Sequence, residues 1–133
     1  MRNAILDLDT SGQTCIDLTS HVRSFCASEI SGLCNVFVPH ATAGLAIIEL
    51  GAGSERDLAE LIERILPRQN IYSHVHGSVG HGRDHVLPAL ISPSVTVPVI
   101  DGEPAFGTWQ YLVLVDTNRD NPQRQVRLSF LTG

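Results

Sequence analysis

The segments Val95-Thr-Val-Pro-Val99, Thr108-Trp-Gln-Tyr-Leu-Val-Leu-Val115 and Val126-Arg-Leu-Ser-Phe130 decide the fold class of this chain. Apolar residues recur at alternate positions or run together with β-branched neighbours, a pattern typical of strands. Asp101-Gly102 is a hairpin turn signal, and the polar residues 117–122 form another turn. Since no crossover helix separates these strands, we predict that they form an antiparallel sheet.

More strands are predicted upstream, at residues 3–9, 13–17, 33–38 and 40–49. The first two are expected to form a hairpin, because the turn residues Thr10-Ser-Gly12 lie between them. Residues 33–38 are continuously apolar, which favours a strand buried on both faces.

Three helices are predicted from apolar residues at helical spacing. They run from Thr19 to Ile30, from Ser54 to the residue before Pro67, and from Val86 to Ile91. The number of strands implies two packed layers with the helices outside. The 133 residues, 43% hydrophobic, suffice for one core. We therefore expect an α+β fold, with residues 1–133 forming a single domain.

Composition excludes several functions. The net charge of −5 disfavours nucleic-acid binding, and no apolar run is long enough for a membrane span. We therefore expect a cytoplasmic protein. All nine basic residues are arginine, which excludes a catalytic lysine and a phosphate-binding loop that requires lysine. The three cysteines show no paired spacing and are expected to be free thiols.

Four of the six histidines lie in the stretch Tyr72-Ser-His-Val-His-Gly-Ser-Val-Gly-His-Gly-Arg-Asp-His85. Imidazole is a common metal ligand and titrates near neutral pH, so the cluster indicates a metal site or an acid/base site. His74 and His76 share a face if this stretch is extended. No zinc motif of fixed spacing is present, and a polar glycine-rich loop with incidental histidines is the alternative.

Four motifs, read together, resemble the YjbQ family, also called the secondary thiamine-phosphate synthase family. They are Pro39-His-Ala-Thr-Ala-Gly-Leu-Ala-Ile-Ile-Glu49, Tyr72-Ser-His74, Asp84-His85 and Gly107-Thr-Trp-Gln110. The resemblance implies a jelly-roll-like antiparallel β-sandwich with flanking helices, assembled as a homotrimer. It also implies weak condensation of a pyrimidine pyrophosphate with a thiazole phosphate, and therefore a small phosphorylated substrate.

The resemblance also places candidate site residues. The positions that match family motifs are His40, Thr42, Glu49, Tyr72, His74, His85, Thr108, Trp109 and Gln110. His76 and His81 do not match, and His81 lies in His81-Gly-Arg-Asp84, where the family has Asn-Ala-x-Ala. Because His81 lies between two glycines, we expect it to lack rigid support and to be dispensable.

From these positions we form three hypotheses. In the first, a transferase, His40, His74 and His85 converge as ligands of zinc or a similar divalent metal, or as proton carriers. His40, Glu49 and His85 would then be catalytic, with Glu49 orienting a histidine. Substrate would contact Thr42, Tyr72, Thr108, Trp109 and Gln110, unless Trp109 is simply a core residue of its strand. The second is a metal-dependent hydrolase, and the third a non-catalytic, metal-stabilised trimeric binding protein.

Overall fold

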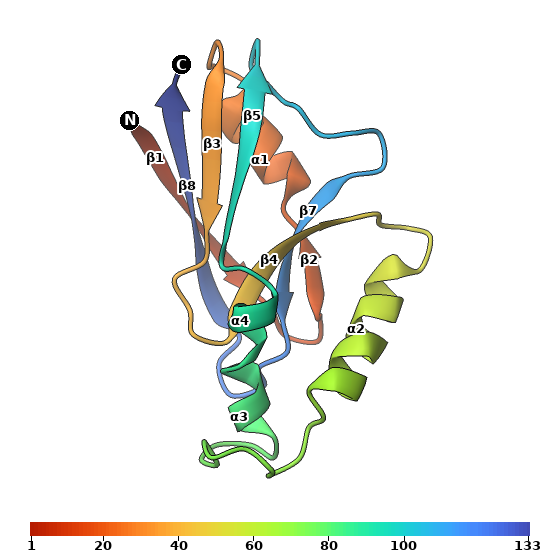
Figure 1. The fold of residues 1–133 in the computed structure, drawn as a ribbon. Coiled ribbons are helices and arrows are strands. Elements are labelled where there is room, and N and C mark those ends of the chain that lie inside the picture. Colours follow the sequence, from red (N-terminus) through yellow and green to blue (C-terminus); the bar gives the residue numbers. More distant parts are fainter.

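Two antiparallel sheets form the body of the computed structural model, which describes residues 1–133 (Figure 1). The larger sheet has the strand order β1 (Arg2–Asp9), β8 (Gln123–Thr132), β3 (Gly32–Phe37), β5 (Ser94–Ile100) and β6 (Glu103–Pro104). The smaller has the order β2 (Cys15–Asp17), β7 (Tyr111–Asp116) and β4 (Ala43–Ile48). The helices are α1 (Thr19–Cys26), α2 (Ser54–Ile65), α3 (His81–Asp84) and α4 (Leu87–Leu90). All strand pairs are antiparallel, so the predicted α+β class is confirmed.

The main core contains side chains from both sheets and from α1. Leu128 and Phe130 of β8 and Leu112 and Leu114 of β7 are at most 1% exposed within it. Val22 of α1 is fully buried in the same cluster. Because the two sheets and α1 share these contacts, burial of apolar surface holds the layers together. The jelly-roll-like form of this arrangement stays a prediction.

A second, smaller core lies on the other face of β7. Val113 and Val115 pack there with Ile62 of α2 and with Leu87 of α4. Strand β7 is therefore buried on both faces, which explains its continuous apolar sequence. This second core attaches α2 and α4 to the smaller sheet.

Two sequence predictions about the strands are wrong. β1 pairs along its length with β8, and β2 pairs with β7 in the other sheet, so they form no hairpin. A turn signal specifies that the chain reverses but not which strand becomes its neighbour. In β3, Cys34 and Val36 are buried whereas Leu33 and Phe37 are 45% and 38% exposed. That strand therefore buries one face only.

None of the helices is long and apolar enough to span a membrane. The cysteines are free, as expected, and Cys26 and Cys34 are buried.

Candidate functional site

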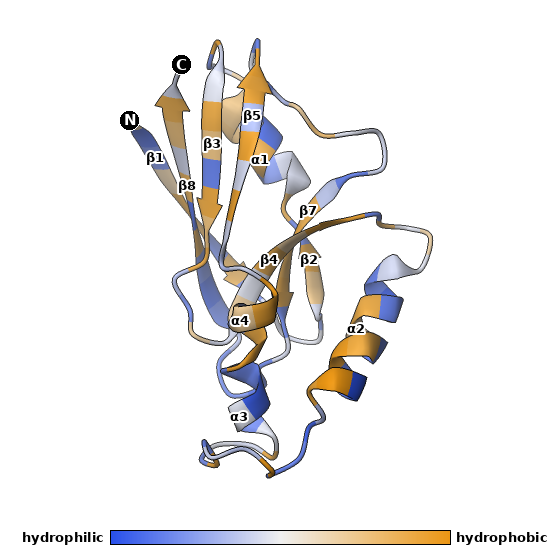
Figure 2. Ribbon diagram, in the orientation of Figure 1, coloured by the Kyte–Doolittle hydropathy of each residue, from blue (hydrophilic) through white to orange (hydrophobic).

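The histidine-rich stretch divides into an irregular segment, residues 72–80, and the short helix α3. Gly80 has a φ of 74°, in the left-handed region that favours glycine, and turns the chain into the helix. His81 begins α3 and His85 lies four residues on, so their side chains come from successive turns. The polar α3 is followed by the apolar α4 (Figure 2), whose Leu87 is 1% exposed. Both histidines are thus attached to the second core, and the expectation that His81 lacks rigid support is wrong.

Glycine at position 82 lets the irregular segment lie directly against α3. A Cβ atom there would be 2.1 Å from the carbonyl oxygen of His74 and 2.8 Å from the Cβ of Tyr72. The close approach brings His74 to the histidines of α3. The Tyr72 hydroxyl donates a hydrogen bond to the carbonyl oxygen of Pro67 at 3.0 Å. Tyr72, predicted to bind substrate, therefore braces this segment.

Three imidazoles converge where the segment and helix meet. The ligand atoms of His74, His81 and His85 all lie within 4.8 Å of one another. His81 Nε2 and His85 Nε2 are 2.9 Å apart, and the rings of His74 and His85 are stacked with centroids 4.1 Å apart. The exposed His76 brings its Nε2 into contact with His74 Nε2. The structure thus joins four ring nitrogens in one cluster, the four-histidine cluster.

An acidic residue from a distant part of the chain holds His81. Asp120 Oδ2 is 2.5 Å from His81 Nδ1 and also accepts hydrogen bonds from the backbone N–H and the hydroxyl of Ser78. Burial raises the pKa of Asp120, but the hydrogen bonds from Ser78 and His81 outweigh it and leave this pKa below its ordinary value. An ionised Asp120 accepts a hydrogen bond from Nδ1–H and leaves the lone pair of Nε2 free for a ligand bond.

Electrostatics favour the ligand form of the imidazoles. Burial, followed by the neighbouring His76 and His81, lowers the pKa of His74. The pKa of His85 is lowered by burial and then by His74 and the other imidazoles. Both rings are therefore neutral at neutral pH, as metal coordination requires. Three convergent imidazole nitrogens with a carboxylate behind one of them fit a zinc-like ion.

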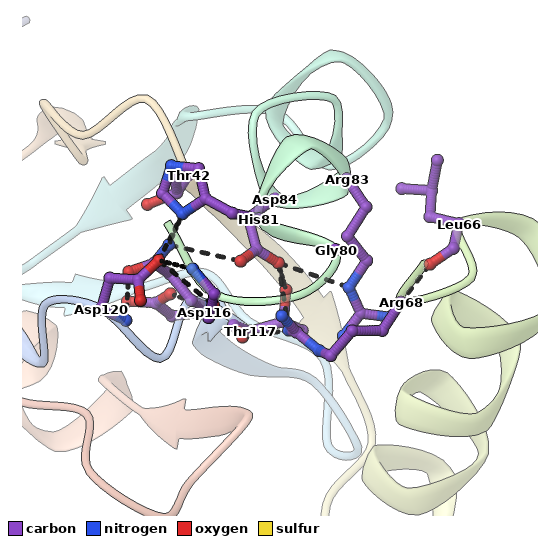
Figure 3. Close-up of polar contacts among 12 residues, drawn as sticks. Thr42, Leu66, Arg68, Gly80, His81, Arg83, Asp84, Asp116, Thr117 and Asp120 are labelled. Atoms are coloured by element: carbon purple, nitrogen blue, oxygen red, sulfur yellow. Dashed lines mark hydrogen bonds and ion pairs between the residues drawn. The ribbon is translucent and has the colours of Figure 1, made fainter. Parts of the chain in front are cut away.

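Asp84, the last residue of α3, is the centre of a buried charge network (Figure 3). Its fully buried carboxylate accepts a hydrogen bond from the Thr117 hydroxyl at 2.6 Å. Arg68 and Arg83 each approach the same Oδ1 atom at 3.3 Å. The Asn118 amide contacts Asp84 Oδ2 and His81 Nδ1, both at 3.3 Å. The network thus links the back of the four-histidine cluster to the arginines near α2.

His40, predicted as a metal ligand, lies outside the convergent group. Its Nε2 accepts the backbone N–H of Gln125 at 2.9 Å. Burial and the charge of Arg124 lower the pKa of His40. Thr42 is 7% exposed, and its hydroxyl accepts a hydrogen bond from Arg124 Nη2 at 3.0 Å. The ion pair of Arg124 Nε with Asp116 Oδ2, 2.5 Å long, completes this second buried network.

The remaining predicted residues lie at the opposite end of the smaller sheet. Ala43 faces Asp116 whereas Ile48 faces Tyr111, so Glu49 and the turn at 107–110 are both far along β4 and β7 from Asp116. Glu49, Thr108 and Gln110 are exposed, and Trp109 is 68% exposed. The strand placed over 108–115 begins only at Tyr111, and Trp109 is not a core residue. Within one chain these residues do not meet the four-histidine cluster.

Sequence reasoning missed two site residues, Asp120 and Asn118. Both lie in the polar turn after β7, which carried no signal of contact with residues 74–85. For His81 a signal did exist: its spacing of four residues from His85 places both on one helical face. That spacing is informative only if residues 81–84 are helical, and the glycines at 80 and 82 in a polar stretch argue against predicting a helix there.

The chain is similar over its whole length to known proteins. The family model described as UPF0047 protein YjbQ-like matches residues 4–133. A UPF0047 protein of Mycobacterium tuberculosis is 60% identical over 133 residues, 100% of both chains. A UPF0047 protein of Archaeoglobus fulgidus is 32% identical, over 84% of this chain and 86% of its own. The crystal structure of a hypothetical protein from Aeropyrum pernix superposes with a TM-score of 0.90 at 26% identity, covering 100% of each chain.

Proposed function

The chain belongs to the UPF0047 YjbQ-like family, and we propose that it is a metal-dependent enzyme acting on a small phosphorylated molecule. The observation that carries this proposal is the convergence of His74, His81 and His85, with Asp120 behind His81. These three residues would hold a zinc-like divalent ion. His76, which contacts His74, is a candidate fourth ligand on an exposed segment.

A catalytic role is favoured over a purely structural one by the ligand set. Structural zinc sites have four protein ligands, mostly cysteine and histidine, whereas catalytic sites keep one position open. The three convergent imidazoles leave such a position, and the exposed His76 is not one of the three. When bound there, a divalent ion supplies Lewis acidity toward a phosphoryl oxygen or a water molecule. The role of this chain is to orient His81 through Asp120 and to keep His74 and His85 neutral by lowering their pKa values.

Two reactions are compatible with this site. Hydrolysis of a phosphate ester needs only the three-imidazole centre and water. Condensation of a pyrimidine pyrophosphate with a thiazole phosphate, which the family resemblance implies, needs the same charge stabilisation at the departing pyrophosphate. The second reaction also needs a place for two heterocycles, for which the exposed Trp109 offers a stacking surface.

Metal content and turnover test the proposal together. Tag-free protein is expected to retain about one zinc-like ion per chain after dialysis, because three convergent imidazoles bind such an ion tightly. Elemental analysis measures this, and turnover is then assayed with the pyrimidine pyrophosphate alone and with the thiazole phosphate added. Release of pyrophosphate only with both substrates supports the transferase, whereas phosphate release from one substrate supports the hydrolase. Full turnover after complete metal removal would contradict metal-dependent catalysis.

The trimer implied by the resemblance is also part of the proposal. Leu33 and Leu131 lie opposite each other in register and are 45% and 57% exposed, which gives the larger sheet an apolar outer patch for a neighbour. A neighbouring subunit could also bring its exposed Glu49 and Trp109 toward the four-histidine cluster. Light scattering at micromolar concentration is expected to give the mass of three chains. A stable monomer at that concentration would contradict the trimer, because Glu49 and Trp109 could then not reach the four-histidine cluster.

A further inference from the structure

A cavity of about 530 Å³ lies on the α2 side of α3. We propose that this cavity binds the phosphate group of a hydroxyl-rich small molecule, such as a sugar phosphate, and that it does so without a metal ion. It is lined by residues of α2, of the connection between β1 and β2, and of the segment 116–119. We call it the arginine cavity.

The lining of the arginine cavity is polar and positively charged. Four arginines and three acidic residues line it. One of the three acids, Asp116, is already paired with Arg124, which does not line the cavity. Glu63 is paired with Arg83 at 2.9 Å, and Glu60 with Arg56 at 3.4 Å. Two cavity arginines, Arg68 and Arg119, therefore have no acidic partner among the lining residues.

Arg68 has fewer hydrogen-bond acceptors than its guanidinium can use. Its side chain is only 10% exposed, and its buried Nε–H has no acceptor. Nη1 donates to the Val79 carbonyl oxygen at 3.3 Å, and Nη2 donates to Thr117 O at 2.6 Å and to Asp84 at 3.3 Å. A guanidinium carries five N–H donors, so Arg68 is under-satisfied. A buried donor left without a partner costs about 1–3 kcal/mol, which an arriving oxyanion can recover.

The buried arginines also exceed the buried acid between them. Arg83 has a side chain 3% exposed and shares the carboxylate of Asp84 with Arg68. Its Nη1 is occupied by Leu66 O and by the half-exposed Glu63, and its Nη2 makes no hydrogen bond within the protein. Two buried positive charges thus surround one buried negative charge. This excess favours an anion that can accept several hydrogen bonds, which phosphate does better than a singly charged carboxylate.

The lining also indicates what is attached to the phosphate. Ala59 is the single hydrophobic residue among the 14 that line the cavity, and no aromatic ring lies among them. A heteroaromatic ring would find no stacking surface there. Glu60 and Glu63 are instead acceptors for hydroxyl groups, and the Thr14 hydroxyl and Gln13 amide supply further polar contacts. This chemistry fits a phosphorylated polyol.

Calorimetric titration of the full chain with inorganic phosphate, ribose 5-phosphate and free ribose tests the proposal. We expect ribose 5-phosphate to bind more tightly than phosphate, and free ribose not to bind. Arg119 is exposed at the cavity and has no ion pair, so Arg119→Gln should preserve the fold and weaken binding about tenfold. Arg68→Lys, which keeps the charge but loses the planar fork, should weaken binding about tenfold or more.

Two controls separate this site from the metal centre. Arg64→Gln removes an exposed arginine of α2, a helix that contributes to the lining, but Arg64 itself does not line the cavity. Binding should therefore change less than twofold. Chelator-treated protein and His85→Ala are expected to bind ribose 5-phosphate as the intact protein does. Loss of binding on metal removal would place the phosphate on the metal and overturn the proposal. Equal losses in Arg64→Gln and Arg119→Gln would reduce the effect to general charge and would overturn it as well.

Discussion

Replacing His81 or His85 by alanine is expected to lower the affinity for zinc by more than about 100-fold, while His40→Ala leaves it within about threefold, because only the first two remove a coordinating nitrogen. The geometry reverses the ranking that motif positions predict. His81 converges with His74 and His85, whereas His40 Nε2 is occupied by the Gln125 backbone N–H. Zinc affinity is measured by competition with a chelating dye, and circular dichroism checks that each variant is folded.

Asp120→Asn belongs in the same series as an intermediate variant. The Asp120 carboxylate contacts His81 Nδ1 and not the Nε2 atom that would bind the metal. Loss of the carboxylate charge should therefore lower metal affinity by about 10–100-fold. His21→Ala, on α1 and exposed, is the matched control and should leave metal affinity unchanged. If His40→Ala proves as damaging as His85→Ala while folded, the convergence of His74, His81 and His85 is not the metal site.

Asp116→Asn is expected to destabilise the domain by about 3–5 kcal/mol, the usual cost of breaking a buried ion pair by removing one partner. The side chains of Asp116 and Arg124 are 1% and 4% exposed, so Arg124 would keep a buried, uncompensated charge. Thr42 and Asn118 contact the other side of its guanidinium and cannot supply a negative charge. Urea unfolding followed by circular dichroism measures the loss.

The exposed pair Arg56–Glu60 provides the control for this prediction. Its side chains are 84% and 53% exposed, so Glu60→Gln should change stability by no more than about 0.5 kcal/mol. The double variant Asp116→Asn with Arg124→Met should be more stable than Asp116→Asn alone, because it removes the unpaired charge. A loss below about 1 kcal/mol in Asp116→Asn would mean that solvent reaches Arg124 more easily than its burial implies.

Strand positions were predictable to the extent that they depend on local pattern. Alternation in residues 95–99 and 126–130 located β5 and β8, and Asp101-Gly102 forms the expected turn with φ of 49° and 80°. Both positive angles match a two-residue hairpin turn. The partner of β1 was not predictable in this way, because β8 lies at the other end of the chain and both β2 and β8 are possible neighbours.

Local sequence patterns were enough to predict the α+β class, the antiparallel strands, the family and the stretch 72–85 that contains the candidate site. Tertiary structure alone decided which side chains meet there. His81 joins His74 because Gly82 admits the close approach of two backbone segments, and Asp120 reaches His81 across 39 residues. Local periodicity reports which face a residue occupies, since it depends on backbone geometry over a few residues. Contacts between distant residues depend instead on how the sheets and helices pack, which no local pattern encodes.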